Sequence, residues 1–341
     1  MRKKKTEANF FDFSKKLFLK NEKFIFVGKL LQKAYRQFPD KIALVDNDRS
    51  ITYKEFYFRS ILLSEYLKSM QIAPGEKIMI FCENSVEFCV YYFASWQIGA
   101  VVIPVNIFLH EKELQIIIND SQPKIVLTTE NFRVKFDNLK NKNLLDTNPT
   151  ILTQEVLDWN SPIPPRIEDL YPDFRGQSLE QKDLCLILYT SGTTGKPKGV
   201  MLSSENIMTN LMQAYARLKL IGLKDNERFF CVIPLFHVFA QNMCFWVPIL
   251  TGGSSIIVKR IERKLILKQL QQKPTVFIGV PALYGLLCLM KTAPLDSVKI
   301  FVSGADALPD KIRAAFAAVY GRRICAGYGL TEASPLVSID Y

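Results

Sequence analysis

Residues 77–106 read KIMIFCENSVEFCVYYFASWQIGAVVIPVN, and this stretch decides the fold class. The apolar run KIMIFCEN at 77–84 predicts a buried strand. SVEFCVYYFASWQIGA at 85–100 predicts a helix whose C-terminal glycine is Gly99. VVIPVN at 101–106 predicts a second strand. Strand, helix and strand in this order are typical of a parallel βαβ unit, so the sequence predicts an α/β protein.

The same alternation continues on both sides of this stretch. KIALVDNDRSITYKEF at 41–56 predicts two short strands joined by a polar turn, and the helix over 52–70 ends before Pro74 and Gly75. A helix is predicted at 110–122 and a strand at 124–129. Strand and helix alternation resumes after residue 181, in the segments 184–190, 203–218, 228–234, 244–258, 263–272, 275–281, 282–290, 298–304, 309–320 and 322–332.

Changes in residue composition and in the pattern of strands and helices divide the chain into four parts. We expect a basic amphipathic arm at 1–36 and a first α/β subdomain at 37–136. Residues 137–181 are rich in Asn, Asp, Pro and charge, which predicts an irregular connection. A second α/β subdomain is expected at 182–341. No internal repeat is present in the sequence.

The net charge of +11 is concentrated in the arm, where residues 1–36 carry eleven Lys or Arg and three acidic residues. Aromatic and leucine residues accompany these charges, so two interpretations stay open. The arm is a solvated helix packing a few aromatics on the body, or it makes peripheral contact with an anionic membrane. No nucleic-acid-binding motif accompanies the charge, so nucleic acid is not an expected partner.

Cysteine and histidine usage excludes several classes of site. The seven cysteines have no C-x-x-C spacing and lie mostly in apolar runs, so buried free thiols are expected. The two histidines, His110 and His237, are too few for a multi-histidine metal site. No apolar run approaches the roughly 18–20 residues of a membrane span, and no signal-peptide pattern is present. We therefore expect a cytoplasmic protein, with membrane association through the arm as the alternative.

A loop rich in glycine and hydroxyl groups, YTSGTTGKPKGV at 189–200, follows the predicted strand LCLILY. Gly192 and Gly195 are too close together for a P-loop, and Pro197 follows Lys196 where a P-loop has Ser or Thr. The next residues are strand-like, so the loop is expected between two strands. It would bind phosphate through hydroxyls and amides, or it is a flexible turn. The candidate phosphate-binding residues are Thr190, Ser191, Gly192, Thr193, Thr194, Gly195 and Lys198.

The composition of AGYGLTEASP at 326–335 suits a segment that lines one side of a nucleotide-binding site. Gly327 and Gly329 flank Tyr328, so the backbone could approach a base while the ring stacks on it. Thr331 offers a hydroxyl and Glu332 a hard oxygen ligand suited to Mg²⁺. A surface turn after a strand is the alternative interpretation.

His237 lies in the apolar segment PLFHVFA at 234–240. From the residues alone it is either a packed core histidine or a group at the mouth of a pocket. Phe239, Trp246 and Val280 would suit an alkyl or aryl tail, although burial in a core would select the same residues.

The loop at 189–200 resembles the signature loop of the adenylate-forming superfamily, which contains acyl-CoA synthetases, luciferases and peptide-synthetase adenylation domains. Further motifs follow in the order of that family and extend the resemblance over residues 38–339. They are ITYKEF, GAVVIPVN, IPLFHVFA, VFIGVPALY, VSGADALP and GYGLTEASP. The resemblance implies the large N-terminal domain of these enzymes, with two βαβ-type subdomains and mixed, mostly parallel sheets.

The resemblance also implies roles for the candidate residues. The glycine loop and Lys198 would bind the phosphates of ATP, and His237 would border the substrate carboxylate. Gly304, Ala305 and Asp306 of VSGADALP match the segment that lines the adenine, although many relatives carry a small residue at the position of Asp306. Tyr328 would stack on adenine, Thr331 would contact the α-phosphate and Glu332 would hold magnesium. The expected catalytic residues are thus Lys198, His237, Thr331 and Glu332.

The activity implied is ATP-dependent conversion of a carboxylic acid, most simply a fatty acid, to an acyl-adenylate and then to a coenzyme A thioester. ATP, Mg²⁺ and coenzyme A are the expected cofactors. Two alternatives stay open: an adenylation domain that loads a carrier protein, and a catalytically incomplete nucleotide- or acyl-binding remnant. Family members continue beyond the position of Tyr341 with a ribose-binding aspartate, a hinge and a mobile domain that carries a lysine. We therefore expect a fragment of a longer ligase that turns over slowly or not at all alone.

Overall fold

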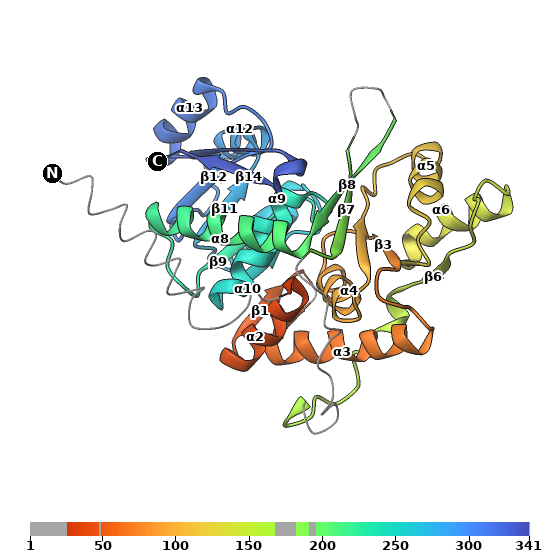
Figure 1. The fold of residues 1–341 in the computed structure, drawn as a ribbon. Helices are drawn as coiled ribbons and strands as arrows, with labels where there is room; N and C mark the ends of the chain where they lie inside the picture. Colours follow the sequence, from red (N-terminus) through yellow and green to blue (C-terminus); the bar gives the residue numbers. More distant parts are fainter. Residues whose placement is uncertain (1–25, 48, 168–181, 191–195, 341) are drawn as a thin grey trace.

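A computed structural model of the 341-residue chain describes residues 26–47, 49–167, 182–190 and 196–340. The described residues form two lobes, each built on one β-sheet (Figure 1). The described residues contain fourteen strands, and most of them alternate with helices as predicted. Helix α6 (Glu130–Asn141) and strands β6 (Thr150–Leu152) and β14 (Leu336–Ile339) were not predicted. The prediction of an α/β fold with mixed, mostly parallel sheets is confirmed.

A six-stranded sheet forms the core of one lobe, in the order β6-β5-β3-β4-β7-β8. Its pairs are parallel except β7 with β8, which form an antiparallel hairpin. The strands are β3 (Lys77–Phe81), β4 (Val101–Pro104), β5 (Ile125–Thr128), β6 (Thr150–Leu152), β7 (Leu184–Thr190) and β8 (Lys198–Ser203).

An eight-stranded sheet forms the core of the other lobe, in the order β14-β13-β12-β11-β9-β10-β1-β2. Its six central strands are parallel, and an antiparallel strand closes each edge. The strands are β1 (Ile42–Val45), β2 (Ser50–Thr52), β9 (Arg228–Cys231), β10 (Ser254–Ile257), β11 (Val276–Gly279), β12 (Ile300–Ser303), β13 (Cys325–Gly329) and β14 (Leu336–Ile339).

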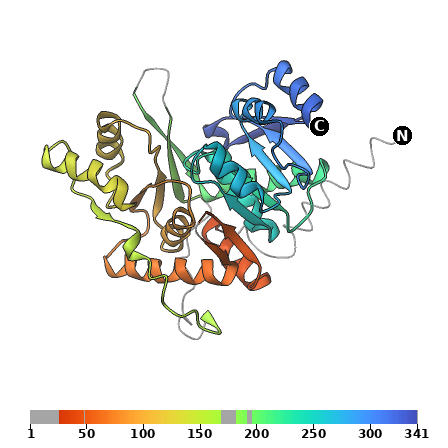
Figure 2. The same ribbon diagram turned by 180° about the vertical axis from the view of Figure 1, so that it is seen from behind.

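Helices cover both faces of each sheet, with α5 and α6 on one outer side of the molecule and α12 and α13 at the opposite end (Figures 1 and 2). The helical segments are η1 (Val27–Lys29), α2 (Leu30–Gln37), α3 (Tyr53–Ser69), α4 (Val86–Gln97), α5 (Glu111–Ser121), α6 (Glu130–Asn141), η2 (Gln154–Val156), α8 (Ser204–Leu220), α9 (Val238–Ala240), the π-helix η3 (Gln241–Trp246), α10 (Val247–Thr251), α11 (Arg263–Leu270), α12 (Pro281–Met290), α13 (Asp310–Tyr320) and η4 (Thr331–Ala333).

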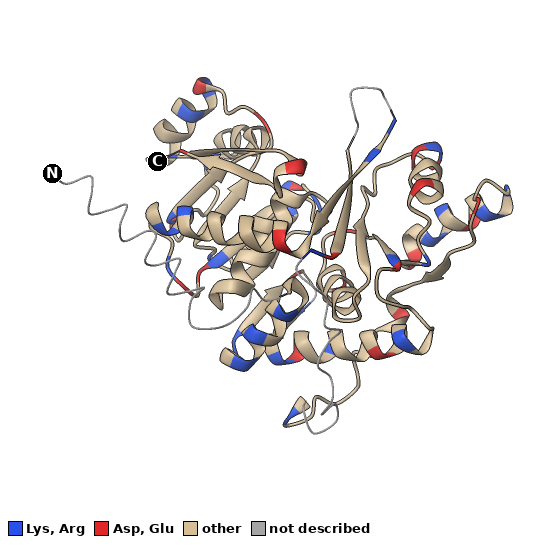
Figure 3. Ribbon diagram, viewed as in Figure 1, with Lys and Arg blue, Asp and Glu red and all other residues tan. Residues whose placement is uncertain are grey.

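The sheets are buried on both faces, which explains why their strands read as continuous apolar runs. Along β3, Ile78 and Ile80 enter a core shared between the two sheets, whereas Met79 and Phe81 face α5 and α6. In the other lobe, Phe230 packs in the core beneath α11, α12 and α13. Figure 3 shows the consequence, because Lys, Arg, Asp and Glu lie mainly on the outer helices and loops.

The predicted subdomain boundaries do not coincide with the division between the sheets. Strands β7 and β8, from the predicted second subdomain, complete the six-stranded sheet. Strands β1 and β2, from the predicted first subdomain, form an edge of the eight-stranded sheet. The chain therefore crosses between the lobes more than once. A boundary placed in the connection at 137–181 does not separate the two sheets.

The expected N-terminal arm is only partly described. Residues 1–25, which carry most of its charge, lie outside the described residues. The segments Val27–Lys29 and Leu30–Gln37 pack on the body through one face, because Val27, Leu30 and Leu31 are buried in the shared core and the Val27 N–H donates to Ser204 Oγ at 2.9 Å. The opposite face, with Lys33 and Arg36, is exposed. Among the described helices, none combines the length and apolarity needed to cross a membrane.

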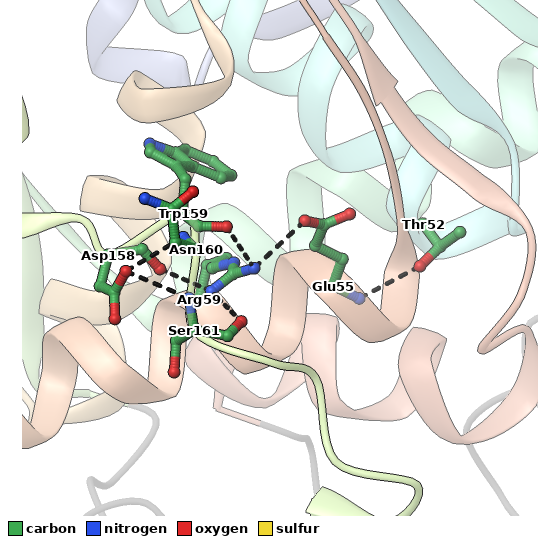
Figure 4. A network of polar contacts seen from close by, with 7 residues as sticks. All are labelled: Thr52, Glu55, Arg59, Asp158, Trp159, Asn160 and Ser161. Atoms are coloured by element: carbon green, nitrogen blue, oxygen red, sulfur yellow. Dashed lines mark hydrogen bonds and ion pairs between the residues drawn. The ribbon is translucent and has the colours of Figure 1, made fainter.

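The connection predicted as irregular over 137–181 is ordered in its described part. It begins inside α6, adds β6 to the sheet edge beside β5, and then packs on α3 through Arg59 (Figure 4). The buried Arg59 guanidinium donates to the carbonyls of Asp158 at 2.5 Å, Ser161 at 2.9 Å and Trp159 at 3.0 Å, and pairs with Glu55 at 3.5 Å. Residues 168–181 lie outside the described residues.

Candidate functional site

A pocket of about 480 Å³ opens at the carboxyl ends of β9, β11, β12 and β13. Ligand sites of open α/β sheets lie at this edge, and the volume is within the range of small-molecule sites. Thr190, the last residue of β7, brings the six-stranded sheet into the same pocket. Its apolar lining consists of Val232, Ile233, Pro234, Val238, Phe239, Ile261, Val280, Leu283, Leu330, Pro335 and Leu336.

Most of the residues predicted from sequence gather in this pocket. They are Thr190, His237, Gly304, Ala305, Gly327, Tyr328, Gly329, Thr331 and Glu332. Segments that lie far apart in the sequence thus meet at one sheet edge, as expected for residues that follow parallel strands.

Several predicted residues are placed elsewhere. Asp306 does not line the pocket; it is exposed, and its carboxylate accepts a hydrogen bond from the Ala307 N–H at 2.7 Å. Lys198 is exposed at the first position of β8 and is also absent from the lining. Trp246 is fully buried, with its ring centroid 5.6 Å from that of Trp96, so it is a core residue and not part of the pocket wall. Ser191, Gly192, Thr193, Thr194 and Gly195 lie outside the described residues.

The strands on either side of the glycine loop confirm one feature of the prediction. The chain leaves β7 and returns as β8 in antiparallel register, with Thr190 opposite Lys198 and Tyr189 opposite Gly199. A P-loop would instead lead directly into a helix. The Tyr189 hydroxyl donates to Asp120 of α5, which ties the loop end of β7 to the outer helix.

His237 reaches the pocket because the chain turns sharply after β9. Asn84 directs this turn: its Oδ1 accepts from the Leu235 N–H at 2.7 Å, and its Nδ2 donates to the Ile233 carbonyl at 3.0 Å. His237 is the N-cap residue of α9, and its ring lies 4.5 Å from that of Phe236. His237 is exposed to solvent on one side, and apolar neighbours on the other lower its pKa by desolvation, so the ring is neutral at pH 7.

The segment after β12 brings backbone close to the pocket. Gly304 is buried, and a Cβ placed on it would meet Cζ of Phe239 at 2.7 Å. Ala305 has φ +68°, a left-handed conformation that non-glycine residues seldom adopt. Such strain is concentrated at functional sites, which agrees with the position of Ala305 in the pocket wall.

The segment after β13 forms the polar wall of the pocket. Tyr328 is 58% exposed, and Thr331 and Glu332 begin the short helix η4. Within the described part of the chain, the Glu332 carboxylate makes no ion pair and no hydrogen bond, so its oxygens are available to a cation. Gly329 is required by packing, because a Cβ there would lie 2.1 Å from the Pro335 carbonyl oxygen. Gly327 has no such restriction, with its nearest atom at 3.5 Å.

Four buried amide side chains behind the pocket were not predicted from the sequence. Asn84 and Gln241 hold the segment before His237, and Asn210 and Asn242 contact the segment after Glu332. The sequence signal is present only for Gln241 and Asn242, which interrupt an apolar buried stretch where amides need partners. Asn84 and Asn210 have polar neighbours in the sequence and carry no such signal.

Comparisons with known proteins agree with this geometry. The profile of the AMP-binding enzyme family matches residues 31–341. The long-chain-fatty-acid–CoA ligase of Bacillus subtilis is 26% identical over 348 residues, covering 92% of this chain and 61% of the relative. The 4-coumarate–CoA ligase 3 of Arabidopsis thaliana is 28% identical over 309 residues, covering 88% and 55%. The crystal structure of a long-chain-fatty-acid–CoA ligase from Archaeoglobus fulgidus superposes with a TM-score of 0.80 at 20% identity, covering 92% of this chain and 66% of that one.

The chain belongs to the AMP-binding enzyme family. Its fold is that of the N-terminal domain of adenylate-forming enzymes, and its relatives are acyl- and aryl-CoA ligases. CoA ligases of this family use ATP, Mg²⁺ and coenzyme A. The chain spans about three fifths of the length of the curated relatives named above.

Proposed function

We propose that the whole protein activates a carboxylic acid with ATP to give an acyl-adenylate, and then transfers the acyl group to coenzyme A. One observation carries this proposal: a single pocket has a polar wall and an apolar wall. The polar wall contains Tyr328, Thr331 and Glu332, and the apolar wall begins at His237. A nucleotide and an apolar acid could therefore meet where the two walls join.

The polar wall supplies the nucleotide contacts in this proposal. The backbone at Gly304 and Ala305 and the exposed ring of Tyr328 would hold the adenine. The hydroxyls of Thr190 and Thr331 would donate to phosphate oxygens, together with the glycine loop and Lys198.

Glu332 fits the role of a magnesium ligand. It is a hard oxygen donor whose carboxylate has no protein partner in the described part of the chain. No group of three or more His, Cys, Asp or Glu side chains gathers among the described residues. This suits Mg²⁺, which binds through one or two carboxylates and takes its other ligands from phosphates and water. When bound, Mg²⁺ would neutralise negative charge on the phosphates.

The chemistry requires alignment and charge neutralisation more than covalent participation by the protein. A carboxylate oxygen of the acid would attack the α-phosphorus of ATP, and pyrophosphate would leave with the electrons of the broken P–O bond. The coenzyme A sulfur would then attack the acyl carbon and release AMP. His237 lies at the start of the apolar wall, and its neutral ring would orient the carboxylate by a hydrogen bond. Because the ring carries no positive charge, it would not make the carboxylate a weaker nucleophile.

The lining favours a monocarboxylic acid with an apolar body, and we propose a fatty acid as the substrate. Among the described lining residues, none is Lys or Arg, so a second carboxylate in the acid would lack a cationic partner. Aryl acids remain chemically compatible with the same wall, as the similarity to a 4-coumarate–CoA ligase illustrates. The curated relatives named above are CoA ligases, which supports coenzyme A and not a carrier protein as the thiol acceptor.

Titration calorimetry of the 341-residue chain with Mg·ATP tests the nucleotide site. We expect binding that is lost in Thr331→Val and Glu332→Gln and retained in Thr150→Val, a threonine change on the edge strand β6. Acid-dependent exchange of pyrophosphate into ATP by the whole protein then tests the substrate, with decanoate, 4-coumarate and malonate compared. Absence of Mg·ATP binding, or a preference for malonate, would contradict the proposal.

A further inference from the structure

The loop that carries Thr331 and Glu332 is closed by three backbone hydrogen bonds, from the Leu330 N–H to the Pro335 carbonyl at 2.9 Å, from the Ala333 N–H to the Leu330 carbonyl at 3.0 Å and from the Ser334 N–H to the Thr331 carbonyl at 3.1 Å. These bonds fix the shape of the loop but not where it sits in the pocket wall. Helix η4 is one short turn, and the chain then turns at Ser334 and Pro335 before entering β14. Its position relative to the pocket is set by contacts with the helices behind it.

Asn210 of α8 makes the closest of these contacts. Its Nδ2 donates to the carbonyls of Leu336 at 2.7 Å and Ala333 at 3.1 Å, and its Oδ1 accepts from the Leu336 N–H at 3.0 Å. Asn242 Nδ2 donates to the same Oδ1 at 3.1 Å. Asn210 thereby makes all four hydrogen bonds that a carboxamide can form. The two carbonyls and the backbone N–H also fix which side of the amide is nitrogen.

Asn242 links this arrangement to the opposite wall of the pocket. It belongs to the π-helix η3, which follows His237 after one turn of helix. Its neighbour Gln241 donates to the Leu235 carbonyl at 2.8 Å and accepts from the Tyr92 hydroxyl at 3.0 Å. Adjacent residues of one π-helix thus contact the chain on both sides of the pocket. π-Helical turns are uncommon and recur at functional sites.

We propose that Asn210 and Asn242 are positioning residues that hold the Thr331–Glu332 loop in the geometry required for Mg·ATP. This inference rests on the nucleotide site proposed above. Both side chains are at least nine-tenths buried, and neither lines the pocket, so they act through the loop and not on the ligand. The Asn210 amide makes all four of its hydrogen bonds and so restricts its partners to one arrangement. Asn242 acts through its Nδ2 alone, since its buried Oδ1 has no partner within the described residues.

The test compares two asparagines of the same helix. Asn210→Ala removes all contacts to the loop, whereas Asn206→Ala removes only the exposed capping interaction with Ser203 at the start of α8. We expect Asn210→Ala to weaken Mg·ATP binding about tenfold, the effect of one or two lost hydrogen bonds. Asn206→Ala should lower the melting temperature but keep the dissociation constant within about twofold of the wild-type value.

A second variant guards against loss of folding. Asn242→Leu removes one hydrogen bond to Asn210 and leaves the other three in place, so its effect on Mg·ATP binding should be smaller than that of Asn210→Ala. Hydrogen exchange of the Leu336 amide provides a readout that needs no nucleotide. It should become faster in both variants and stay unchanged in Asn206→Ala.

The outcomes separate this inference from the proposed function. If Thr331→Val abolishes Mg·ATP binding while folded Asn210→Ala and Asn242→Leu bind as the wild type does, the positioning role is wrong and the nucleotide site stands. If the wild type does not bind Mg·ATP, the proposed nucleotide site fails, and the exchange of the Leu336 amide alone decides whether the asparagines hold the loop. Unchanged exchange in both variants overturns the inference.

Discussion

The ring of Phe239 occupies the space that any side chain at Gly304 would need. A Cβ at position 304 would approach Cζ of Phe239 to 2.7 Å, so the apolar wall and the segment after β12 are in direct contact. Gly304→Ala should push the ring into the pocket and cost about 1–3 kcal/mol of stability. Thermal unfolding and titration with Mg·ATP would measure both effects.

Gly285→Ala is the matched control for that change. Gly285 lies inside α12, where a Cβ would meet only Ile312 Cδ1 at 3.8 Å. Alanine in a helix interior is favoured over glycine by about 0.5–1 kcal/mol, so this variant should be slightly stabilised. If Gly304→Ala were as stable as the wild type and bound Mg·ATP as the wild type does, the contact between Phe239 and position 304 would not matter for the pocket.

The two glycines of GYG should respond differently to the same substitution. Gly329→Ala brings Cβ within 2.1 Å of a backbone oxygen at Pro335, which cannot move aside as a side chain can. We expect a loss of about 3 kcal/mol or more in the free energy of unfolding. Gly327→Ala meets nothing closer than 3.5 Å and should change that free energy by about 0.5 kcal/mol or less. Urea unfolding of both variants makes the comparison, and equal losses would contradict it.

Stability should depend on pH through His237. Desolvation lowers the pKa of His237 in the folded state, so the unfolded chain binds this proton more readily. The penalty is absent above the ordinary histidine pKa of about 6.5, grows as the pH falls below it, and levels off below the lowered pKa. Melting temperatures at pH 8, 7, 6 and 5 should therefore fall more steeply for the wild type than for His237→Gln. A constant difference across this range would show that the ring is not desolvated.

Arg59 should be one of the most sensitive charged residues. Its guanidinium satisfies three carbonyls of the turn at Asp158–Ser161 while only 3% exposed, so Arg59→Ala leaves those acceptors and Glu55 without their donor. We expect a loss of about 2–4 kcal/mol in urea unfolding. Arg59→Lys should recover only part of it, because one ammonium lacks the fork geometry of arginine.

An exposed ion pair provides the control for Arg59. Lys142 contacts Glu111 at 2.7 Å on the surface, and Lys142→Ala should cost about 0.5 kcal/mol or less. A loss at position 142 as large as that at position 59 would show that burial is not what makes Arg59 important.

Local patterns were sufficient to predict most individual elements. The stretch 77–106 folds as β3, α4 and β4, with Gly99 at φ +80° after the helix. Its signals are local, namely an apolar run, a helix-ending glycine and a second apolar run. The residues of GYGLTE also lie together in the pocket, because a short motif after a parallel strand needs no long-range information to reach the sheet edge.

Features that depend on long-range pairing were missed. Nothing near β7 shows that it pairs with β4, so the predicted division at 137–181 does not follow the division between the two sheets. Nothing in the neighbouring sequence shows the role of Asn210 or Asn242, since their backbone partners lie about a hundred residues further along the chain. The π-helix at Gln241–Trp246 was not predicted, because the residues of a π-helix do not follow the 3.6-residue period on which helix prediction depends.

The place of β1 in the eight-stranded sheet has a consequence for how the protein is made. Leu44 of β1 lies beside Ser255 of β10, and strands β9 to β14 all follow β8 in the sequence. A ribosome therefore completes the six-stranded sheet while β1 and β2 still lack their neighbour. Non-local pairing of this kind is slow and leaves strand edges exposed meanwhile. The sheet that bears the pocket is thus assembled late in translation, after its own first two strands have been synthesised.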